Sequence, residues 1–253
     1  MILLAPEQIS TLKSWFLPER PGPVIGSHVI QTGNGTCFAN RWPSPQVILI
    51  ETAGNFALLG NPQAINSNDI KSHIKGFVAT SPLFLPTLKA AFPDLGIWKR
   101  IIFTQRDASY HISGNQHTIR RLAPSDTHHL QELSTESAWI SKTWGGPVNL
   151  AASGFGWGAF VDGQLASVAC TFFLGETYED IGVVTEPRFQ GLGLSTACVE
   201  SLCQDIRTRN HQPSWTTSPD NLASRRVAEK LGFTIQRHDL LYVVGVPIPE
   251  PIS

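Results

Sequence analysis

The segment 180–210 constrains the fold of this chain more than any other stretch, because it combines a strand, a glycine loop and a helix. Its first part, Ile181–Thr185, predicts a buried strand that ends at Pro187, since proline cannot donate to a strand ladder. Gly191 and Gly193 follow two residues apart, and apolar residues then recur at spacings of three and four, as in an amphipathic helix. A loop that runs from a strand into a helix gathers backbone N–H groups and the positive end of the helix dipole. The segment therefore predicts a phosphate-binding site.

Composition limits the partners that this protein can have. Hydrophobic residues make up 42% of the 253 residues and charged residues 15%, so the chain can build a substantial core. The formal charge of −1 argues against broad electrostatic binding of nucleic acid or of an acidic membrane. No apolar run approaches the length of a membrane span, and the first six residues are too short for a signal sequence. We expect a cytoplasmic protein without nucleic-acid or membrane partners.

Cysteine and histidine usage argues against a metal site. The four cysteines form no Cys-x-x-Cys pair, and we expect them to be buried, reduced thiols. They are Cys37, Cys170, Cys198 and Cys203. The eight histidines do not cluster at ligand spacing. On a helix, the adjacent His128 and His129 would point about 100° apart, which is unfavourable for sharing one metal ion.

The patterns divide the chain into two α/β units. In the first unit, helices are expected at residues 6–17 and 81–91, and strands at 37–42, 46–51, 55–59 and 98–104. The polar stretch 107–116 is the expected boundary, so residues 1–115 form an N-terminal α/β domain without a recognisable catalytic motif. Residues 116–253 form the second domain.

In the second domain, strands are expected at 118–122, 156–161, 164–174, 181–185 and 213–217, with further strand residues at 234–246. Asp162-Gly163 predicts a tight hairpin between two of these strands. A helix is expected after Asn221, closed by Gly232 at its C-terminal end. The expected class is α/β (α+β), with a mixed central sheet flanked by helices.

Two segments of the second domain resemble the GNAT superfamily of acyl-CoA N-acyltransferases. Gln190-Gly191-Leu192-Gly193-Leu194-Ser195 resembles the acyl-CoA-binding loop of that family. Residues 221–233, an asparagine followed by a helix that ends in Lys-Leu-Gly-Phe, resemble its second motif. The resemblance covers residues 117–246. The complete layout, with an additional α/β domain in front, is similar to a two-domain GNAT group that includes antibiotic self-resistance acetyltransferases.

The resemblance implies acetyl-CoA as a co-substrate. In that family the pantetheine arm lies between two strands that diverge and pairs with one of them like a missing strand, while loop N–H groups hold the pyrophosphate. A backbone N–H near Val183 would bind the oxyanion of the reacting thioester. The residues that the resemblance implies for acetyl-CoA binding are Val183, Val184, Thr185, Gln190, Gly191, Leu192, Gly193, Leu194, Ser195, Thr196, Asn221 and Ser224.

Two adjacent carboxylates are candidates for the catalytic base. Glu179 falls where several members of the family keep a glutamate base, and Asp180 points to the opposite face of the same strand. The sequence favours Glu179 over Asp180. The alternative is that both residues only solvate the beginning of a strand.

The general acid is not identified by the sequence. The family often has a tyrosine seven residues after the asparagine of the second motif, but this chain has Ala228 there. Tyr178, Tyr242, Ser224 and water remain alternatives.

The resemblance implies an acyltransferase that moves an acetyl group from acetyl-CoA to a primary amine of a small molecule, by direct attack in a ternary complex. One alternative is a non-catalytic acyl-CoA-binding regulatory module, and another is a protein or peptide N-acetyltransferase. A second copy of the chain, forming a homodimer, is a further candidate partner. No metal cofactor is expected.

Overall fold

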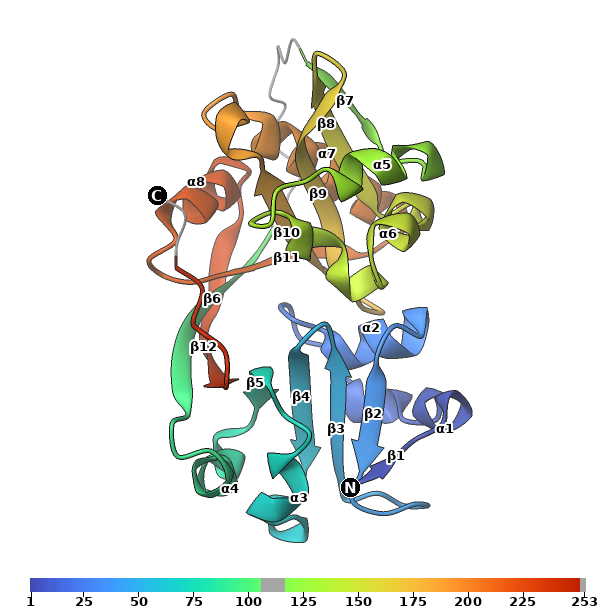
Figure 1. Cartoon of the computed structure of the whole chain (residues 1–253), viewed down its shortest axis with the longest axis vertical. Helices are drawn as coiled ribbons and strands as arrows, with labels where there is room; N and C mark the ends of the chain where they lie inside the picture. Colours follow the sequence, from blue (N-terminus) through green and yellow to red (C-terminus); the bar gives the residue numbers. More distant parts are fainter. Residues whose placement is uncertain (106–116, 251–253) are drawn as a thin grey trace.

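The computed structural model of this chain describes residues 1–105 and 117–250, and its strands in these ranges join one mixed sheet (Figure 1). The strands are β1 (Ile2–Leu3), β2 (Thr36–Ala39), β3 (Val47–Thr52), β4 (Asn55–Gly60), β5 (Gly76–Thr80), β6 (Gly96–Thr104), β7 (Thr118–Arg121), β8 (Gly156–Val161), β9 (Gln164–Leu174), β10 (Tyr178–Thr185), β11 (Gln212–Thr217) and β12 (Thr234–Val244). The order across the sheet is β1-β2-β3-β4-β5-β12-β6-β11-β10-β9-β8-β7.

Helices cover both faces of this sheet. The α-helices are α1 (Pro6–Ser10), α2 (Ile25–Thr32), α3 (Ser67–Lys71), α4 (Leu85–Ala91), α5 (Thr127–Gln131), α6 (Pro147–Ser153), α7 (Leu194–Thr208) and α8 (Leu222–Lys230). The 3-10 helices are η1 (Lys13–Phe16), η2 (Pro62–Ala64), η3 (Pro82–Phe84), η4 (Pro124–Asp126), η5 (Ala138–Trp144) and η6 (Pro187–Phe189). The mixed α/β class expected from the sequence is confirmed.

The strand order has an internal symmetry. Each strand corresponds to the strand six places away in the chain, for example β1 to β7 and β6 to β12. When every strand is replaced by its counterpart, the result is the same strand order read from the opposite edge of the sheet. Each half has antiparallel strands followed by one parallel pair, β4 with β5 and β10 with β11. The two halves therefore repeat one strand arrangement within a single sheet.

The two halves also exchange a strand at the centre of the sheet. β6, from the N-terminal half of the sequence, pairs with β11 and β12 of the C-terminal half, while β12 pairs with β5 and β6. Figure 1 shows β6 and β12 side by side between the two halves. The proposed division at residue 115 separates the halves in sequence, but residues 96–104 complete the C-terminal part of the sheet. The expected boundary at 107–116 lies outside the described residues.

The hydrophobic core forms four clusters, one on each face of each half. In the C-terminal half, α7 and α8 bury apolar side chains on one face, and η5, α5 and α6 cover the other face. In the N-terminal half, α3 and α4 cover one face, and α1 and α2 cover the other. Phe173 of β9 belongs to the cluster around α1 and α2, so the two halves share core residues.

Several local predictions are confirmed. Asp162 and Gly163 have φ values of 48° and 78°, which fit a tight turn between β8 and β9. All four cysteines are free and buried. Burial raises the pKa of Cys37, Cys198 and Cys203 to about 12.

The sequence patterns missed α2, α3, β5 and α6. α2 contains glycine, threonine and β-branched residues, which are weak helix formers, and packs against β3 and β9. Its burial, rather than its helix propensity, therefore accounts for its formation. Within residues 1–105 and 117–250, no helix is both long and apolar enough to span a membrane.

Candidate active site

β10 and β11 separate at the C-terminal ends of the two strands. Their parallel pairing runs from Tyr178–Gln212 to Ile181–Trp215. Beyond that point, among the described strands, residues 182–185 pair with β9 and residues 216–217 pair with β6. Each strand therefore has an edge without a neighbouring strand, which is where the resemblance places an extended ligand arm.

The backbone of Val183 and Thr185 faces this open edge. The Glu186 N–H donates to the Ala166 carbonyl over 2.9 Å, continuing the regular antiparallel register of β10 with β9. In such a ladder, alternate residues direct both backbone polar groups to the same neighbour. The backbone N–H and C=O groups of Val184 therefore point to β9. Those of Val183 and Thr185 point to the opposite side, from which β11 has diverged. Of the three β10 residues predicted to bind acetyl-CoA, Val183 and Thr185 have the required orientation.

The glycine loop leads directly from this edge into α7. Gly191 and Gly193 have φ values of 81° and 75°, and a Cβ atom at either position would meet no atom within 4 Å. Gly193 is the N-cap of α7, and among the described residues no side-chain hydrogen bond caps this helix end. The N–H groups at this helix end are therefore available to an anion. Because Gly193 is the N-cap, Ser195 does not cap α7.

The remaining predicted loop residues lie around this helix end. Gln190 and Leu192 are exposed, Ser195 is half-buried, and Leu194 and Thr196 are buried in the first turn of α7. The side chains of Leu194 and Thr196 thus face the protein, and only the backbone of these two residues can serve a ligand.

The second predicted segment joins α8 to β11. Asn221 is the N-cap of α8, and its Oδ1 accepts a hydrogen bond from the Ser224 N–H over 3.0 Å. The Ser224 Oγ accepts a hydrogen bond from the Trp215 indole N–H over 2.9 Å. These contacts place Asn221 and Ser224 beside the end of β11, where that strand diverges from β10, and give both side chains structural partners.

The positions considered for a general acid are widely separated. Ala228 is fully buried in the core under α8. Tyr242 is buried in the core of the N-terminal half, and Tyr178 lies at the end of β10 remote from the divergence. Ser224 is the member of this set that lies beside the diverging strands.

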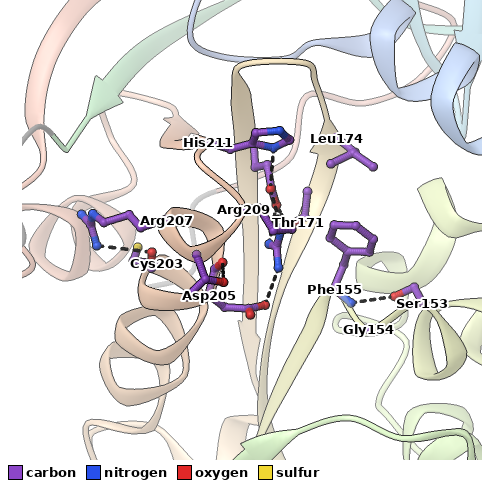
Figure 2. A network of polar contacts seen from close by, with 12 residues as sticks. Ser153, Gly154, Phe155, Thr171, Leu174, Cys203, Asp205, Arg207, Arg209 and His211 are labelled. Carbon is purple, nitrogen blue, oxygen red and sulfur yellow. Dashed lines mark hydrogen bonds and ion pairs between the residues drawn. The ribbon is translucent and has the colours of Figure 1, made fainter.

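Glu179 is fully buried and bound on both carboxylate oxygens. Its Oε1 accepts hydrogen bonds from Arg209 Nε and His211 Nδ1, each over 2.9 Å. Its Oε2 accepts from Arg209 Nη2 over 2.8 Å and from the Thr171 hydroxyl. Figure 2 shows the side chains of Arg209, His211 and Thr171 together at this point. Four donors leave little capacity on this carboxylate for a substrate proton.

A second carboxylate extends this ion-pair network. Asp205 accepts hydrogen bonds from Arg209 Nη1 over 2.6 Å and from Arg121 Nη1 over 2.9 Å. Although burial acts in the opposite direction, the hydrogen bonds from these arginines hold the pKa of Asp205 below its usual value. The network connects β7, α7, β10 and the segment before β11, as expected for a structural link.

Asp180 is buried on the opposite face of β10. Its Oδ1 accepts hydrogen bonds from Ser214 Oγ over 2.9 Å and from Thr216 Oγ1 over 3.0 Å. Its Oδ2 accepts none from the described residues. Burial raises the pKa of Asp180 to about 6, and the two hydroxyl donors oppose that shift. Asp180 therefore has a free oxygen next to the divergence, whereas Glu179 does not.

Within the described residues, no group of three or more His, Cys, Asp or Glu side chains is arranged to hold a metal ion. The groups available at this site include backbone donors, one carboxylate with an oxygen that accepts no hydrogen bond from the described residues, and hydroxyl groups.

Comparison with known families and proteins identifies the family of this chain. The profile of a family described as GNAT acetyltransferase matches residues 22–242, which include both halves of the sheet. An uncharacterized N-acetyltransferase of Streptomyces virginiae is 37% identical over 83% of this chain and 90% of its own length. An uncharacterized N-acetyltransferase of Bacillus subtilis is 22% identical over 94% of this chain and 97% of its own length.

Solved structures share the whole fold at low identity. A GCN5-related N-acetyltransferase-like protein of Streptococcus suis has a TM-score of 0.70 at 18% identity, covering 94% of this chain and 98% of its own. A tandem GNAT protein from the clavulanic acid biosynthesis pathway has a TM-score of 0.59 at 12% identity, covering 98% and 99%. At these identities the likeness establishes the fold.

Proposed function

Because this chain belongs to the GNAT acetyltransferase family, we propose that it moves an acetyl group from acetyl-CoA to a primary amine of a small molecule. The amine attacks the thioester directly in a ternary complex. The observation that carries this proposal is the open edge of β10 leading into the uncapped N-terminus of α7.

The chain's own backbone fits acetyl-CoA at this edge. Val183 and Thr185 would pair with the amide groups of the pantetheine arm, as an added strand does. The N–H groups from Gly191 to Thr196 would bind the pyrophosphate, since no side chain in the described part of the chain caps this helix end. The empty space beside Gly191 and Gly193 allows a phosphate to approach the backbone.

We assign the catalytic base to Asp180. The sequence favours Glu179, but the contacts favour its neighbour, because Glu179 is held by four donors and Asp180 keeps one free oxygen. A carboxylate with a raised pKa accepts a proton efficiently near neutral pH. In this role Asp180 takes a proton from the amine as the nitrogen bonds to the acetyl carbon.

The other roles follow the same geometry. The Val183 N–H, directed toward the open edge, would donate to the carbonyl oxygen as negative charge develops on it. The leaving thiolate would take its proton from Ser224 or from water. Thiols titrate at about 8.5, so this thiolate is a tolerable leaving group near neutral pH even without a tyrosine.

Two other functions are considered beside this one. The buried Ala228, in place of the usual tyrosine, favours a non-catalytic acyl-CoA-binding module. A protein or peptide N-acetyltransferase would use the same donor site with a different acceptor.

A combined binding and turnover experiment separates these functions. Acetyl-CoA affinity is measured by calorimetry, and release of the coenzyme A thiol is followed with a panel of small primary amines and of peptides. Turnover with small amines above the rate in buffer supports the proposal. Tight binding without turnover on any amine supports the module, and turnover on peptides alone supports the third function. Absence of acetyl-CoA binding contradicts all three.

A further inference from the structure

Arg100 of β6 is a partly buried cation without a carboxylate partner. Its Nη2 donates to the Thr216 carbonyl over 3.1 Å, while its Nε is buried and has no hydrogen-bond partner. Within residues 1–105 and 117–250, no carboxylate oxygen lies within 4.0 Å of this guanidinium. A donor that is buried and unpaired is unfavourable unless a ligand completes it.

The surroundings of Arg100 keep its side chain in place. The guanidinium carbon lies 3.8 Å from the centre of the Trp98 ring, and Trp98 in turn contacts Phe77 with ring centres 5.2 Å apart. Burial lowers the pKa of Arg100 to about 10, although Asp180 and Asp220 attract its charge. The group remains a cation at neutral pH, so this fixed positive charge has no close counter-ion among the described residues.

A second arginine in the same region shows the contrast. Arg237 of β12 also contributes to the electrostatic environment of Asp180. Its Nε pairs with Asp239 over 3.2 Å, and its Nη1 donates to the Pro21 carbonyl over 2.6 Å. Arg237 therefore already has a carboxylate and a carbonyl. Of these two arginines, Arg100 is the one without a carboxylate partner among the described residues.

Arg100 and the proposed base are connected through a single residue. The Thr216 hydroxyl donates to Asp180, and the Thr216 carbonyl accepts from Arg100. Thr216 is the first residue of β11 beyond its pairing with β10, so this connection lies where the reacting thioester is proposed to lie. On this face the Gly22 N–H donates to Ser214 Oγ, so the segment before α2 borders the same region.

We propose that Arg100 binds a carboxylate of the acceptor, which makes the acceptor a small molecule with a primary amine and a carboxylate, such as an amino acid. This inference rests on the proposed function. The acceptor nitrogen bonds to the acetyl carbon as the carbon–sulfur bond breaks. The amine proton passes to Asp180, the thiolate takes up a proton, and the acceptor carboxylate stays ionised on Arg100. A guanidinium fits a carboxylate through two parallel N–H donors.

The test compares amines that differ only in a carboxylate. Thiol release is measured with alanine against ethylamine, phenylalanine against phenethylamine, and lysine against cadaverine. The variants are Arg100→Met, which keeps an unbranched chain over Trp98, and Arg100→Lys, which keeps the charge. The control is Lys99→Met, an exposed neighbour on the other face of β6. Thermal unfolding of each variant checks that it is folded.

The expected result is a higher kcat/KM for at least one amino acid than for the matching amine, by about tenfold or more. Arg100→Met removes this difference, Arg100→Lys keeps part of it, and Lys99→Met leaves it unchanged. The affinity for acetyl-CoA is unchanged in all three variants. A loss of acetyl-CoA affinity in Arg100→Met would instead assign Arg100 to a phosphate of the coenzyme and overturn the inference.

Failure of this inference is distinguishable from failure of the proposed function. Turnover of amines without discrimination between the members of a pair contradicts the carboxylate site alone. If no amine is acetylated, the proposed function fails, and the carboxylate site is judged by calorimetric titration of the same pairs in the presence of coenzyme A. The carboxylate site is supported if the unmodified protein binds the amino acids and the Arg100→Met variant does not. It is overturned if, in every pair, the amino acid and its matching amine bind equally or neither of them binds.

Discussion

The carboxylate of Glu179 and the guanidinium of Arg209 form a two-point ion pair, with Nε–Oε1 at 2.9 Å and Nη2–Oε2 at 2.8 Å. Glu179 is fully buried, and Arg209 is 24% exposed. The pair connects the beginning of β10 with the residues that follow α7. The residue that the sequence favours as a base thus lies in a structural network, and the free carboxylate oxygen belongs to its neighbour.

Replacing Glu179 is expected to reduce stability. Glu179→Gln removes the charge that compensates Arg209 in a buried site, and loss of one partner of a buried pair costs about 3 kcal/mol. Urea unfolding at pH 7 measures this change. The matched control is Glu176→Gln, whose ion pair with Lys13 is exposed and contributes less than about 1 kcal/mol. Unchanged stability together with a collapse of kcat would return the role of base to Glu179.

Replacing Asp180 is expected to reduce the rate. Asp180→Asn keeps the size of the side chain but cannot accept the proton, so kcat falls by about 10² to 10⁴ while acetyl-CoA affinity is retained. In the unmodified protein, kcat/KM decreases as the pH falls below about 6, because the base becomes protonated. Steady-state kinetics from pH 5 to 8 test both points, with the turn variant Asp162→Asn as control. Turnover by Asp180→Asn close to that of the unmodified protein would exclude Asp180 as the base.

A methyl group at Gly193 is expected to weaken acetyl-CoA binding. Gly193→Ala adds a Cβ atom on the open side of the loop, where it meets no protein atom but would obstruct a phosphate. The expected loss is about tenfold or more in acetyl-CoA affinity by calorimetry. Gly163→Ala is a matched control, since Gly163 has φ +78 and an equally empty surrounding, and it carries the same backbone strain. Equal affinity in the two variants would remove the loop from the coenzyme site.

His28 is expected to make stability depend on pH. Its Nε2 donates to the Thr143 carbonyl over 2.9 Å, and its Nδ1 accepts from the Leu174 N–H over 3.0 Å, so the buried ring is neutral. Burial lowers the pKa of His28 to about 4, although the bond to Thr143 opposes that shift. Between pH 6.5 and 4 the unfolded chain therefore binds the proton more tightly, and the folded state loses about 3 kcal/mol as the pH falls through this range.

The measurement is the difference in unfolding free energy between the unmodified protein and His28→Asn, determined at several pH values. The difference isolates His28 from Asp180, whose raised pKa acts with the opposite sign and favours the folded state at low pH. The unmodified protein should lose its advantage as the pH falls from 6.5 to 4. The control His238→Asn, at an exposed position, should leave the pH dependence unchanged. A constant difference across this range would show that folding does not lower the pKa of His28.

Local sequence patterns predicted the helices and strands around the site, because the residues that determine these elements lie close together in the chain. Asp162-Gly163 sets the hairpin between β8 and β9, and Gly193 with the apolar spacing after it sets the start of α7. α2 and α6 were missed, because α2 depends on packing against distant strands and α6 begins directly after Gly145-Gly146 at Pro147. Pro147 occupies the first turn of α6.

The local pattern of residues is enough to predict the strand, the glycine loop and the helix, and to show that Glu179 and Asp180 point to opposite faces of one strand. The partners on each face of that strand become known from the packing of distant segments. Arg209 is 30 positions from Glu179, Ser214 is 34 from Asp180, and Arg100 is 116 from Thr216. Strand periodicity assigns a side chain to one face of the sheet. The burial and the hydrogen-bond partners of that side chain depend on which distant segments cover the face. The exchange of β6 and β12 between the two halves sets which segments do so.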